Sequence, residues 1–474
     1  MHIFLEKRCC SIHTGISNAK EFFMRIIDVL VVGGGASGLQ AAITTKTTYP
    51  DKEVVLVRKE QQVLIPCGIP YIFGTLSDSS KDILPDKLLT SVGVEIVVDE
   101  LIEIKVKEHQ CVLASNEIIQ YTKLILALGS IPTKPAWLKG ADLENVFTIP
   151  KNKEYLDQVL VALSSLKEVM VIGAGFIGVE VSDELNKKGY KVTLLEIEKT
   201  ILNRAFDDEF GVLAQEHLQE RGVRVIVGKG VSEIKGKNGK VSEVVLSTGE
   251  LLKADAVILS MGYAPNTQVA KEAGIELNDF GFIKTCEYMR VLPCSIDIVA
   301  VGDCAEKRDF VTRKIDRTML ASTACAEART AGMNLYSLSP CKPFTGTIAI
   351  YATAIGSHAF GTAGITEAKA MQENFSVICG SFTGMDTHPG NLEHSHKQMV
   401  KLIVASDCGM ILGAEVYGGA STGELTNAIG FLIQNHVTVK QLLTMQIGTQ
   451  PLLTGSPAAY PLVKAAEVIV KKMH

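Results

Sequence analysis

Two glycine-rich segments of this sequence have the spacing that binds the pyrophosphate of a dinucleotide. The first is Gly33-x-Gly35-x-x-Gly38 and the second is Gly173-x-Gly175-x-x-Gly178. Such glycines permit a tight turn and close approach of the backbone to the phosphates, and the following helix attracts the anion with its N-terminus. Because the pattern occurs twice, we expect two dinucleotide sites. The residues expected to line them are Gly33, Gly35, Ala36, Ser37, Gly38, Gly173, Gly175, Phe176, Ile177 and Gly178.

The residue at the end of the strand after each turn bears on which dinucleotide binds. Glu196 follows the apolar run Lys191 to Leu195, where a carboxylate can accept hydrogen bonds from the adenosine ribose. A carboxylate there repels the 2′-phosphate of NADPH, so NADH is favoured, although Glu196 could also be a solvated strand end. At the first site Arg58 stands in this position and Glu60 follows. Either Glu60 takes the ribose or Arg58 binds the nucleotide differently.

The elements around both turns are alike, and they predict the fold class. Each turn follows a β-type apolar run, opens a helix-like stretch and leads to a second β-type run, which indicates parallel sheets with helices on their faces. Two dinucleotides in one chain suggest an electron relay, with a flavin in the first site and a nicotinamide in the second. After about residue 344 we expect an α+β domain without a nucleotide motif. Its expected strands and helix are Thr347 to Tyr351, Val400 to Ala405, Ile411 to Val416 and Leu425 to Gln434.

Composition excludes several other classes of protein. The 474 residues include 47 Lys plus Arg and 52 Asp plus Glu, a balance that argues against a nucleic-acid partner. No apolar run approaches the ~18 residues of a membrane span, so no membrane partner is expected. The 11 cysteines are odd in number and form no CxxC, which fits neither a disulfide framework nor a zinc ribbon. A reducing cytoplasm is the default location.

Three further segments carry a family resemblance. Ile298-Val-Ala-Val-Gly302-Asp303-Cys-Ala305 resembles the second flavin motif of the pyridine nucleotide-disulfide oxidoreductases. The segment 123–132, with Gly129, looks like the family's strand-to-crossover motif, and 256–266, with Gly262, looks like its companion. The resemblance implies that Asp303 binds the ribitol chain of FAD while Gly302 lets the backbone approach it. It also implies a C-terminal dimerisation domain and a homodimer.

One cysteine stands at the family's redox position. The segment Leu64-Ile-Pro-Cys67-Gly68-Ile-Pro70-Tyr-Ile72 lies where the dithiol branch has a CxxxxC pair, but Ile72 replaces the second cysteine. The chain therefore resembles the single-cysteine branch, whose cysteine cycles through a sulfenic acid, persulfide or mixed disulfide. Pro70 can begin a helix, so we expect a helix N-terminus to lower the pKa of the Cys67 thiol. A small buried hydrophobe is the alternative for Cys67.

The resemblance implies an enzyme that passes electrons from NADH through FAD to Cys67. Coenzyme A disulfide, a persulfide or a polysulfide is the expected oxidant, because CGIPY is closer to the form typical of those reductases. An NADH oxidase or peroxidase using a Cys67 sulfenic acid is the alternative, and a flavin-bound redox sensor with little turnover is an alternative of another class. NADPH is a less favoured donor, and coenzyme A is a possible substrate component.

Other candidate residues have ordinary explanations beside functional ones. Gln450 stands where the dithiol branch has a basic His, which leaves the acid–base partner of Cys67 unidentified; Tyr71 and Tyr460 are candidates, with packing preferred for both. His388, Glu393, His394 and His396 could ligate a metal, but we favour a solvated loop and expect no metal. The charged segment 307–317 could bind coenzyme A phosphates, or it could be an exposed loop.

The order of the motifs predicts the domain organisation. Residues 1–23 are expected to be a disordered leader or a misplaced start before Met24, with an organelle signal as the minority alternative. Residues 24–150 and 271–343 are expected to form an FAD domain that is split by an NAD domain at 151–270. Residues 344–474 are expected to form the dimerisation domain. The predicted fold class is thus α/β, with two doubly wound nucleotide-binding domains and a C-terminal α+β domain.

Overall fold

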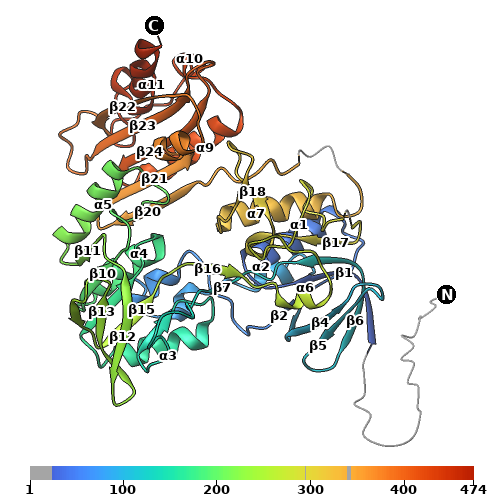
Figure 1. Cartoon of the computed structure of the whole chain (residues 1–474). Helices are drawn as coiled ribbons and strands as arrows, with labels where there is room; N and C mark the ends of the chain where they lie inside the picture. The colour runs from blue at the N-terminus through green and yellow to red at the C-terminus, as the bar shows by residue number, and fades with distance from the viewer. Residues whose placement is uncertain (1–23, 294, 339–342, 474) are drawn as a thin grey trace, which may run out of the picture.

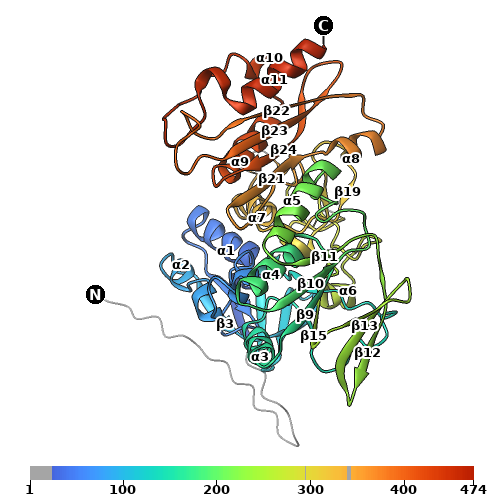
Figure 2. The same cartoon turned by 90° about the vertical axis from the view of Figure 1, so that its left-hand side faces the viewer.

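The computed structural model describes residues 24–293, 295–338 and 343–473. Two nucleotide-type sheets lie side by side, and a C-terminal sheet is stacked above the second of them (Figures 1 and 2). The expectation for residues 1–23 lies outside the described residues. None of the helices within the described ranges is long and apolar enough to cross a membrane.

The first sheet is parallel in its nucleotide-binding half, with the order β3-β2-β1-β6 and with β17 paired to the carboxyl end of β6. Its central strands are apolar at successive positions because helices cover both faces. Antiparallel β4 and β5 extend it along the first half of β6. The bounds are β1 (Met24–Val32), β2 (Val54–Arg58), β3 (Glu95–Val98), β4 (Leu101–Lys105), β5 (Gln110–Leu113), β6 (Ile118–Leu126), β17 (Ile298–Ala300), α1 (Ala36–Thr48), α2 (Lys87–Thr90), α6 (Gln268–Glu272) and α7 (Ala321–Met333).

The second sheet repeats this arrangement with the order β11-β10-β9-β15-β8, all parallel. Strands β9, β10, β11, β15 and β8 correspond to β1, β2, β3, β6 and β17. The repeated glycine-rich turns thus reflect a repeated architecture. The bounds are β8 (Val146–Thr148), β9 (Glu168–Ile172), β10 (Lys191–Leu195), β11 (Arg224–Ile226), β15 (Ala256–Leu259), α3 (Lys153–Leu163), α4 (Phe176–Lys187), α5 (Asp208–Glu220) and an antiparallel β12 (Val231–Lys237), β13 (Lys240–Leu246) and β14 (Leu251–Lys253).

A two-stranded ribbon joins the two sheets. Strand β7 (Ser130–Pro132) leaves the first sheet after β6, and β16 (Tyr263–Pro265) leaves the second after β15; the two pair antiparallel. The second sheet therefore lies, in the chain, between β6 and β17 of the first. Three short 3₁₀ helices, η1 (Ile69–Phe73), η2 (Ser79–Asp82) and η3 (Gly302–Cys304), and the hairpin β18 (Lys307–Arg308) with β19 (Ile315–Asp316) complete this part.

The C-terminal sheet is antiparallel, with the order β20-β21-β24-β23-β22. Helices α9 and α11 pack on it, and α5 of the second sheet's unit lies against β20 and β21 (Figure 1). The bounds are β20 (Tyr351–Ile355), β21 (His358–Gly364), β22 (Val377–Met385), β23 (Lys397–Ala405), β24 (Ile411–Gly418), α8 (Glu367–Gln372), α9 (Thr422–Gln434), α10 (Val439–Leu442), α11 (Pro461–Lys472) and the 3₁₀ helix η4 (Pro457–Ala459).

The predicted fold class is confirmed, with one local error. The structure contains two Rossmann-like sheets and a C-terminal α+β part. The run Thr347 to Tyr351 is not a strand, because Ala349 has a φ of 55° and the extended chain of β20 begins only at Tyr351. The expected domain boundaries stay predictions.

Candidate active site

The first glycine-rich turn lies between the carboxyl end of β1 and the start of α1. Gly33 has a φ of 114°, and a Cβ on it would stand 2.1 Å from the carbonyl oxygen of Ala127. A Cβ on Gly38 would stand 1.8 Å from the carbonyl oxygen of Gly33, whereas no atom of the described residues lies within 4 Å of that position on Gly35. The turn is closed toward the protein and open at Gly35, as close approach of a pyrophosphate requires.

Gly302 and Asp303 lie at the carboxyl end of β17, beside this turn. Gly302 has a φ of 77°, and a Cβ on it would stand 2.5 Å from Oγ of Ser37, which follows Ala36 at the start of α1. The backbone N–H of Gly302 donates to the buried Glu327 carboxylate at 2.7 Å. This contact fixes the backbone of Gly302, and with it the position of Asp303, beside the glycine-rich turn.

The Asp303 carboxylate is ionised and already oriented. Its Oδ2 accepts hydrogen bonds from Ser130 Oγ at 2.7 Å and from Lys151 Nζ at 2.6 Å. Burial alone would raise the pKa of Asp303, but Lys151 and Ser130 outweigh burial and hold the pKa below its usual range. Within the described chain, Oδ1 accepts no hydrogen bond. That oxygen can accept a hydrogen bond from a polyol hydroxyl such as those of ribitol.

Gly129 and Gly262 occupy equivalent positions at the two ends of the β7–β16 ribbon. Gly129 has a φ of 70° and Gly262 a φ of 91°. The carbonyl of Gly129 accepts from the N–H of Asn266 at 3.0 Å, and that of Gly262 accepts from the N–H of Thr133 at 2.8 Å. Across the described ranges, no atom lies within 4 Å of a Cβ placed on either glycine. Both glycines therefore stay predicted cofactor contacts.

Arg58 is committed to the protein interior and is not placed to bind a nucleotide. Its side chain is 3% exposed; Nη2 donates to Asp86 Oδ2 and to the carbonyl of Gln61, both at 2.8 Å. Glu60 is half-buried and has no hydrogen bond or ion pair with the residues that the structure describes. Of the two possibilities left by the sequence, Glu60 stays the predicted ribose-binding residue.

The second turn repeats the first in detail. A Cβ on Gly173 would stand 2.3 Å from the carbonyl oxygen of Ser260, and one on Gly178 would stand 1.9 Å from the carbonyl oxygen of Gly173. Gly175 is open, like Gly35. The carboxylate of Glu196 accepts the backbone N–H of Ala174 at 2.7 Å. Glu196 is thus fixed against the turn, where it can accept hydrogen bonds from a ribose and repel a phosphate.

Phe176 and Ile177 open α4 and are both half-buried. The Phe176 ring stacks on Tyr351 of β20, with ring centroids 4.8 Å apart and planes 8° apart. Tyr351 is held in turn by a 3.2 Å hydrogen bond to Thr318. The entrance to the second turn is therefore formed by both the nucleotide-type unit and the C-terminal sheet.

Cys67 lies in the loop before η1, with its side chain accessible to solvent. Gly68 is pressed against Asp82, since a Cβ on Gly68 would stand 1.8 Å from Asp82 Oδ1. The expected lowering of the Cys67 pKa is wrong. η1 is a single 3₁₀ segment of 5 residues. Burial of part of the Cys67 side chain raises its pKa; Glu180 adds to this and Lys151 opposes it.

The redox segment after Cys67 is part of the core of the second unit. Ile72, at the position of the missing second cysteine, is fully buried and packs in one apolar cluster with residues of α4 and β9. Thr75 binds α4 directly, because its Oγ1 donates to Glu184 at 2.8 Å. Position 72 is thus a packing position in this chain, and Cys67 is the only cysteine of the segment.

Three residues near Cys67 carry charge or a proton that motif reasoning did not find. Lys151 follows β8, Asp82 ends η2, and Glu180 lies on α4, where Thr353 donates to it at 2.8 Å. Burial raises the pKa of Glu180 to about 7 and that of Asp82 to about 6. They come from separate elements at no fixed spacing from Cys67, so the sequence held no signal for them.

The tyrosine candidates are poor proton donors in this structure. Burial raises the pKa of Tyr71 well above its usual range, and Glu180 raises it further. Burial likewise raises the pKa of Tyr460, which caps α11. Gln450 lies in an exposed turn, where its side chain accepts the N–H of Leu452 at 2.8 Å.

The histidine-rich loop lies between β22 and β23, and two of its histidines contact nearby residues. His388 bonds through Nδ1 to the carbonyl of Thr454 at 2.8 Å, and His396 lies 3.4 Å from Asp386. In the segment 307–317, the expected exposed loop is wrong for Lys307. It is 3% exposed, because Nζ donates to the carbonyls of Gly302 and Ala305.

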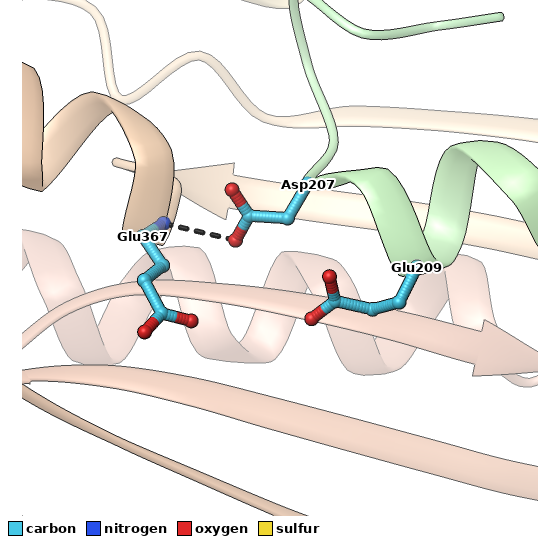
Figure 3. Close-up of side chains that lie close together, drawn as sticks. All are labelled: Asp207, Glu209 and Glu367. Atoms are coloured by element: carbon cyan, nitrogen blue, oxygen red, sulfur yellow. Dashed lines mark hydrogen bonds between the residues drawn. The ribbon is translucent and has the colours of Figure 1, made fainter. Parts of the chain in front are cut away.

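The described chain contains one group of acidic residues close enough to hold a metal: Asp207, Glu209 and Glu367 (Figure 3). Lys401 Nζ lies 2.8, 2.5 and 2.8 Å from their carboxylates, respectively. The ammonium group occupies the centre that a cation would take. The cluster is therefore an ion-pair network that joins α5 to the C-terminal sheet.

Comparison with known proteins gives the family. The family described as pyridine nucleotide-disulphide oxidoreductase matches residues 27–328, and the dimerisation domain of that family matches residues 350–459. The chain belongs to the pyridine nucleotide-disulphide oxidoreductase family. It is thus an oxidoreductase of a family that depends on FAD and NADH, as the sequence motifs implied.

Relatives of this oxidoreductase align with it over almost their whole length. An NADH oxidase of Methanocaldococcus jannaschii is 29% identical, over 94% of this chain and 99% of that protein. An NAD(P)H coenzyme A polysulfide/persulfide reductase of Pyrococcus horikoshii is 28% identical, over 93% of this chain and 98% of that protein. The solved structure of an NAD-dependent persulfide reductase from A. fulgidus is 26% identical, with a TM-score of 0.86 over 94% of this chain and 83% of that one.

Proposed function

We propose that the protein passes electrons from NADH through FAD to Cys67 and on to a small disulfide or sulfane sulfur, such as coenzyme A disulfide, a persulfide or a polysulfide. The observation that carries this proposal is a single accessible thiol in the redox segment. Cys67 is exposed, while Ile72 is a fully buried core residue. An internal dithiol cannot form there, so the oxidised state of Cys67 must involve an external sulfur or oxygen atom.

The residues present fit the two cofactors. For FAD these are the open turn at Gly35, the free Oδ1 of Asp303, the half-buried Glu60 and the open positions at Gly129 and Gly262. For NADH they are the open turn at Gly175 and the Glu196 carboxylate, which favours NADH over NADPH. Bound FAD would accept two electrons from NADH and deliver them to the sulfur of Cys67.

The chain's own residues bind, orient and hold protons around that sulfur. In the thiolate form, Cys67 attacks one sulfur of a disulfide, which forms a mixed disulfide and releases a second thiol. Lys151 favours the thiolate, whereas Glu180 and Asp82 oppose it. The mixed disulfide is then reduced, which releases the remaining thiol and restores the Cys67 thiolate.

The relatives support this substrate class and also keep an alternative open. The Pyrococcus horikoshii relative is named as a coenzyme A polysulfide/persulfide reductase and the solved neighbour as a persulfide reductase. The Methanocaldococcus jannaschii relative is named as an NADH oxidase, which favours reduction of O2 through a Cys67 sulfenic acid as the second candidate. Both candidates require Cys67, so the accepted oxidant separates them.

The test replaces the reacting sulfur. In Cys67→Ser, turnover of coenzyme A disulfide and of polysulfide should fall to background, because no thiolate remains to attack. NADH-dependent reduction of ferricyanide should persist, since that acceptor can take electrons directly from the flavin. Cys408→Ser, which removes another exposed free thiol, is the matched control.

Steady-state NADH consumption then identifies the oxidant. Turnover in air-saturated buffer alone indicates an oxidase, stimulation by peroxide a peroxidase, and stimulation by coenzyme A disulfide or polysulfide the proposed reductase. Negligible turnover with all of them indicates the redox sensor. Normal disulfide turnover by Cys67→Ser contradicts the thiol mechanism.

We also propose a homodimer in the cytoplasm. The match of residues 350–459 to a dimerisation domain supports the dimer. The C-terminal part also exposes large apolar side chains that a second copy can cover, namely Phe431, Leu452 and Leu453. The cysteines within the described ranges are free thiols, which supports a reducing compartment.

A further inference from the structure

Asp82 is a buried carboxyl group without a side-chain hydrogen-bond partner among the described residues, and it lies against the residue that follows Cys67. Its side chain is 3% exposed. A Cβ on Gly68 would stand 1.8 Å from Oδ1 of Asp82 and 3.1 Å from Oδ2. Neither oxygen accepts a hydrogen bond from the residues that the structure describes, and Oδ2 is fully buried. Buried carboxyl groups normally have partners, so an isolated one beside a reactive thiol requires an explanation.

The backbone fixes this placement. The loop before Cys67 pairs with the segment that carries Asp82: the N–H of Ile65 donates to the carbonyl of Asp82, and the N–H of Leu84 donates to the carbonyl of Val63, both at 2.8 Å. Position 68 is glycine, and any larger residue would collide with the carboxyl group. The closeness of Asp82 to the redox loop is therefore built into the chain.

We propose that Asp82 is the proton donor for the thiol that leaves when Cys67 attacks its disulfide substrate. This assignment rests on the proposed function and supplies the acid–base group that the chain lacks at Gln450.

The electrostatics agree with that role. Burial raises the pKa of Asp82 to about 6, so the group holds its proton closer to neutral pH than an exposed carboxyl does. The charged and titratable groups around Cys67 are Lys151 after β8, Glu180 on α4, Asp82, and Cys325 on α7. Ionised Asp82 raises the pKa of Cys67, so the thiolate is favoured while Asp82 is neutral.

The proton and electron balance is complete. The Cys67 thiolate attacks R–S–S–R′, the Cys67–S–S–R bond forms, and R′–S⁻ takes the proton of Asp82 to leave as R′SH. NADH would supply two electrons and one proton by way of bound flavin, and solvent would supply one further proton. The mixed disulfide breaks, RSH leaves, and the Cys67 thiolate and protonated Asp82 are restored.

The test uses holoenzyme of Asp82→Asn, which keeps the shape of the side chain and removes its proton. Turnover of coenzyme A disulfide should fall about a hundredfold or more, as for loss of a general acid. The decline in wild-type turnover as pH rises through the Asp82 pKa should disappear.

Alkylation of reduced Cys67 by iodoacetamide at pH 8 should become faster in Asp82→Asn, because a negative charge near the thiol is gone. Asp78→Asn, which changes an exposed carboxyl at the N-terminal end of η2, is the matched control.

A fall in disulfide turnover together with faster alkylation of Cys67 excludes a merely structural role for Asp82. Unchanged disulfide turnover in Asp82→Asn overturns the proposal, and so does a parallel fall in turnover and alkylation. If the variant does not retain FAD, Asp82→Glu, which keeps the proton, decides: it should retain the pH dependence, and loss of that dependence overturns the proposal. If wild-type enzyme reduces neither coenzyme A disulfide nor polysulfide, the proposed function fails. The alkylation comparison then still shows whether Asp82 and Cys67 are coupled.

Discussion

At the scale of single residues, the site depends on carboxylates held in different protonation states by their surroundings. Asp303 is kept ionised by Lys151 and Ser130, although burial opposes this. Burial raises the pKa values of Asp82 and Glu180 toward neutral pH. The ionised Asp303 can therefore accept hydrogen bonds at the proposed ribitol position, while carboxyl groups that can hold protons lie around the Cys67 sulfur. Separated pKa values of this kind are the pattern expected of acid–base chemistry.

Glu196 provides a prediction at this scale. In Glu196→Gln, the ratio of kcat/KM for NADPH to that for NADH should rise by about tenfold, the equivalent of ~1.4 kcal/mol, because the charge that repels the 2′-phosphate is lost. Gln can still accept the Ala174 N–H, so the turn should keep its shape. Glu198→Gln, two residues further along and exposed, should leave the ratio unchanged. An equal ratio in Glu196→Gln and wild type contradicts the assignment.

At the scale of elements, the short η3 turn joins the two halves of the FAD site. Its Gly302 meets Ser37 at the start of α1, and its N–H is bound by Glu327 of α7. Lys307 donates to the Gly302 carbonyl at 3.0 Å from the other side. Gly302 is thus fixed in a left-handed conformation, at a position where a side chain would collide with Ser37.

Gly302→Ala should therefore release FAD. A Cβ would stand 2.5 Å from Ser37 Oγ, in addition to the strain of Ala at a φ of 77°. We expect the dissociation constant for FAD to increase by at least about tenfold, ~1.4 kcal/mol, measured by flavin fluorescence on dilution. Gly249→Ala is the matched control, because its φ is 84° and no described atom lies within 4 Å of the new Cβ. Equal FAD retention in both variants would show that the contact with Ser37 is unimportant.

At the scale of the whole molecule, a buried charge network docks the C-terminal sheet on the NAD-type unit. Lys401 of β23 binds Asp207 and Glu209 at the start of α5, and Glu415 of β24 accepts the backbone N–H of Asp207 at 2.5 Å. Burial and Asp207 raise the pKa of Glu415 to about 9. Glu415 is therefore neutral at physiological pH, and the docking contact includes a protonated carboxyl group.

Glu415→Gln should stabilise the protein increasingly as pH rises. The folded-state pKa of about 9 lies above the unfolded value of ~4.3. The contribution of Glu415 to stability is thus fully present below the unfolded pKa and is lost as pH rises through the folded pKa. Gln stays neutral, so the variant's advantage in unfolding free energy should grow by up to ~1.4 kcal/mol per pH unit within this window.

Thermal or urea unfolding at pH 6 and pH 8.5 measures this effect. Glu424→Gln, an exposed carboxylate of α9, should show no such growth. A difference between Glu415→Gln and wild type that does not change with pH contradicts a neutral Glu415. EDTA should leave the unfolding curves unchanged, since Lys401 holds the centre of the acidic cluster.

The sequence by itself determined the fold class, the two glycine-rich turns, the Gly302–Asp303 motif and Cys67 with Ile72 in place of a partner. These features are local: spacing within one strand–turn–helix unit specifies its geometry, so the pattern can be read without the fold.

The tertiary structure decided the rest of the site. Lys151 reaches Asp303, and Asp82 reaches Gly68, only because elements that are separate in the sequence meet in the fold. The Cys67 pKa was mispredicted for the same reason. The segment expected to be a helix is a short 3₁₀ segment. Burial and Glu180, which belongs to another unit of the fold, determine the direction in which the Cys67 pKa shifts. Burial and through-space charge depend on what surrounds a residue, and one sequence without its fold does not contain that information.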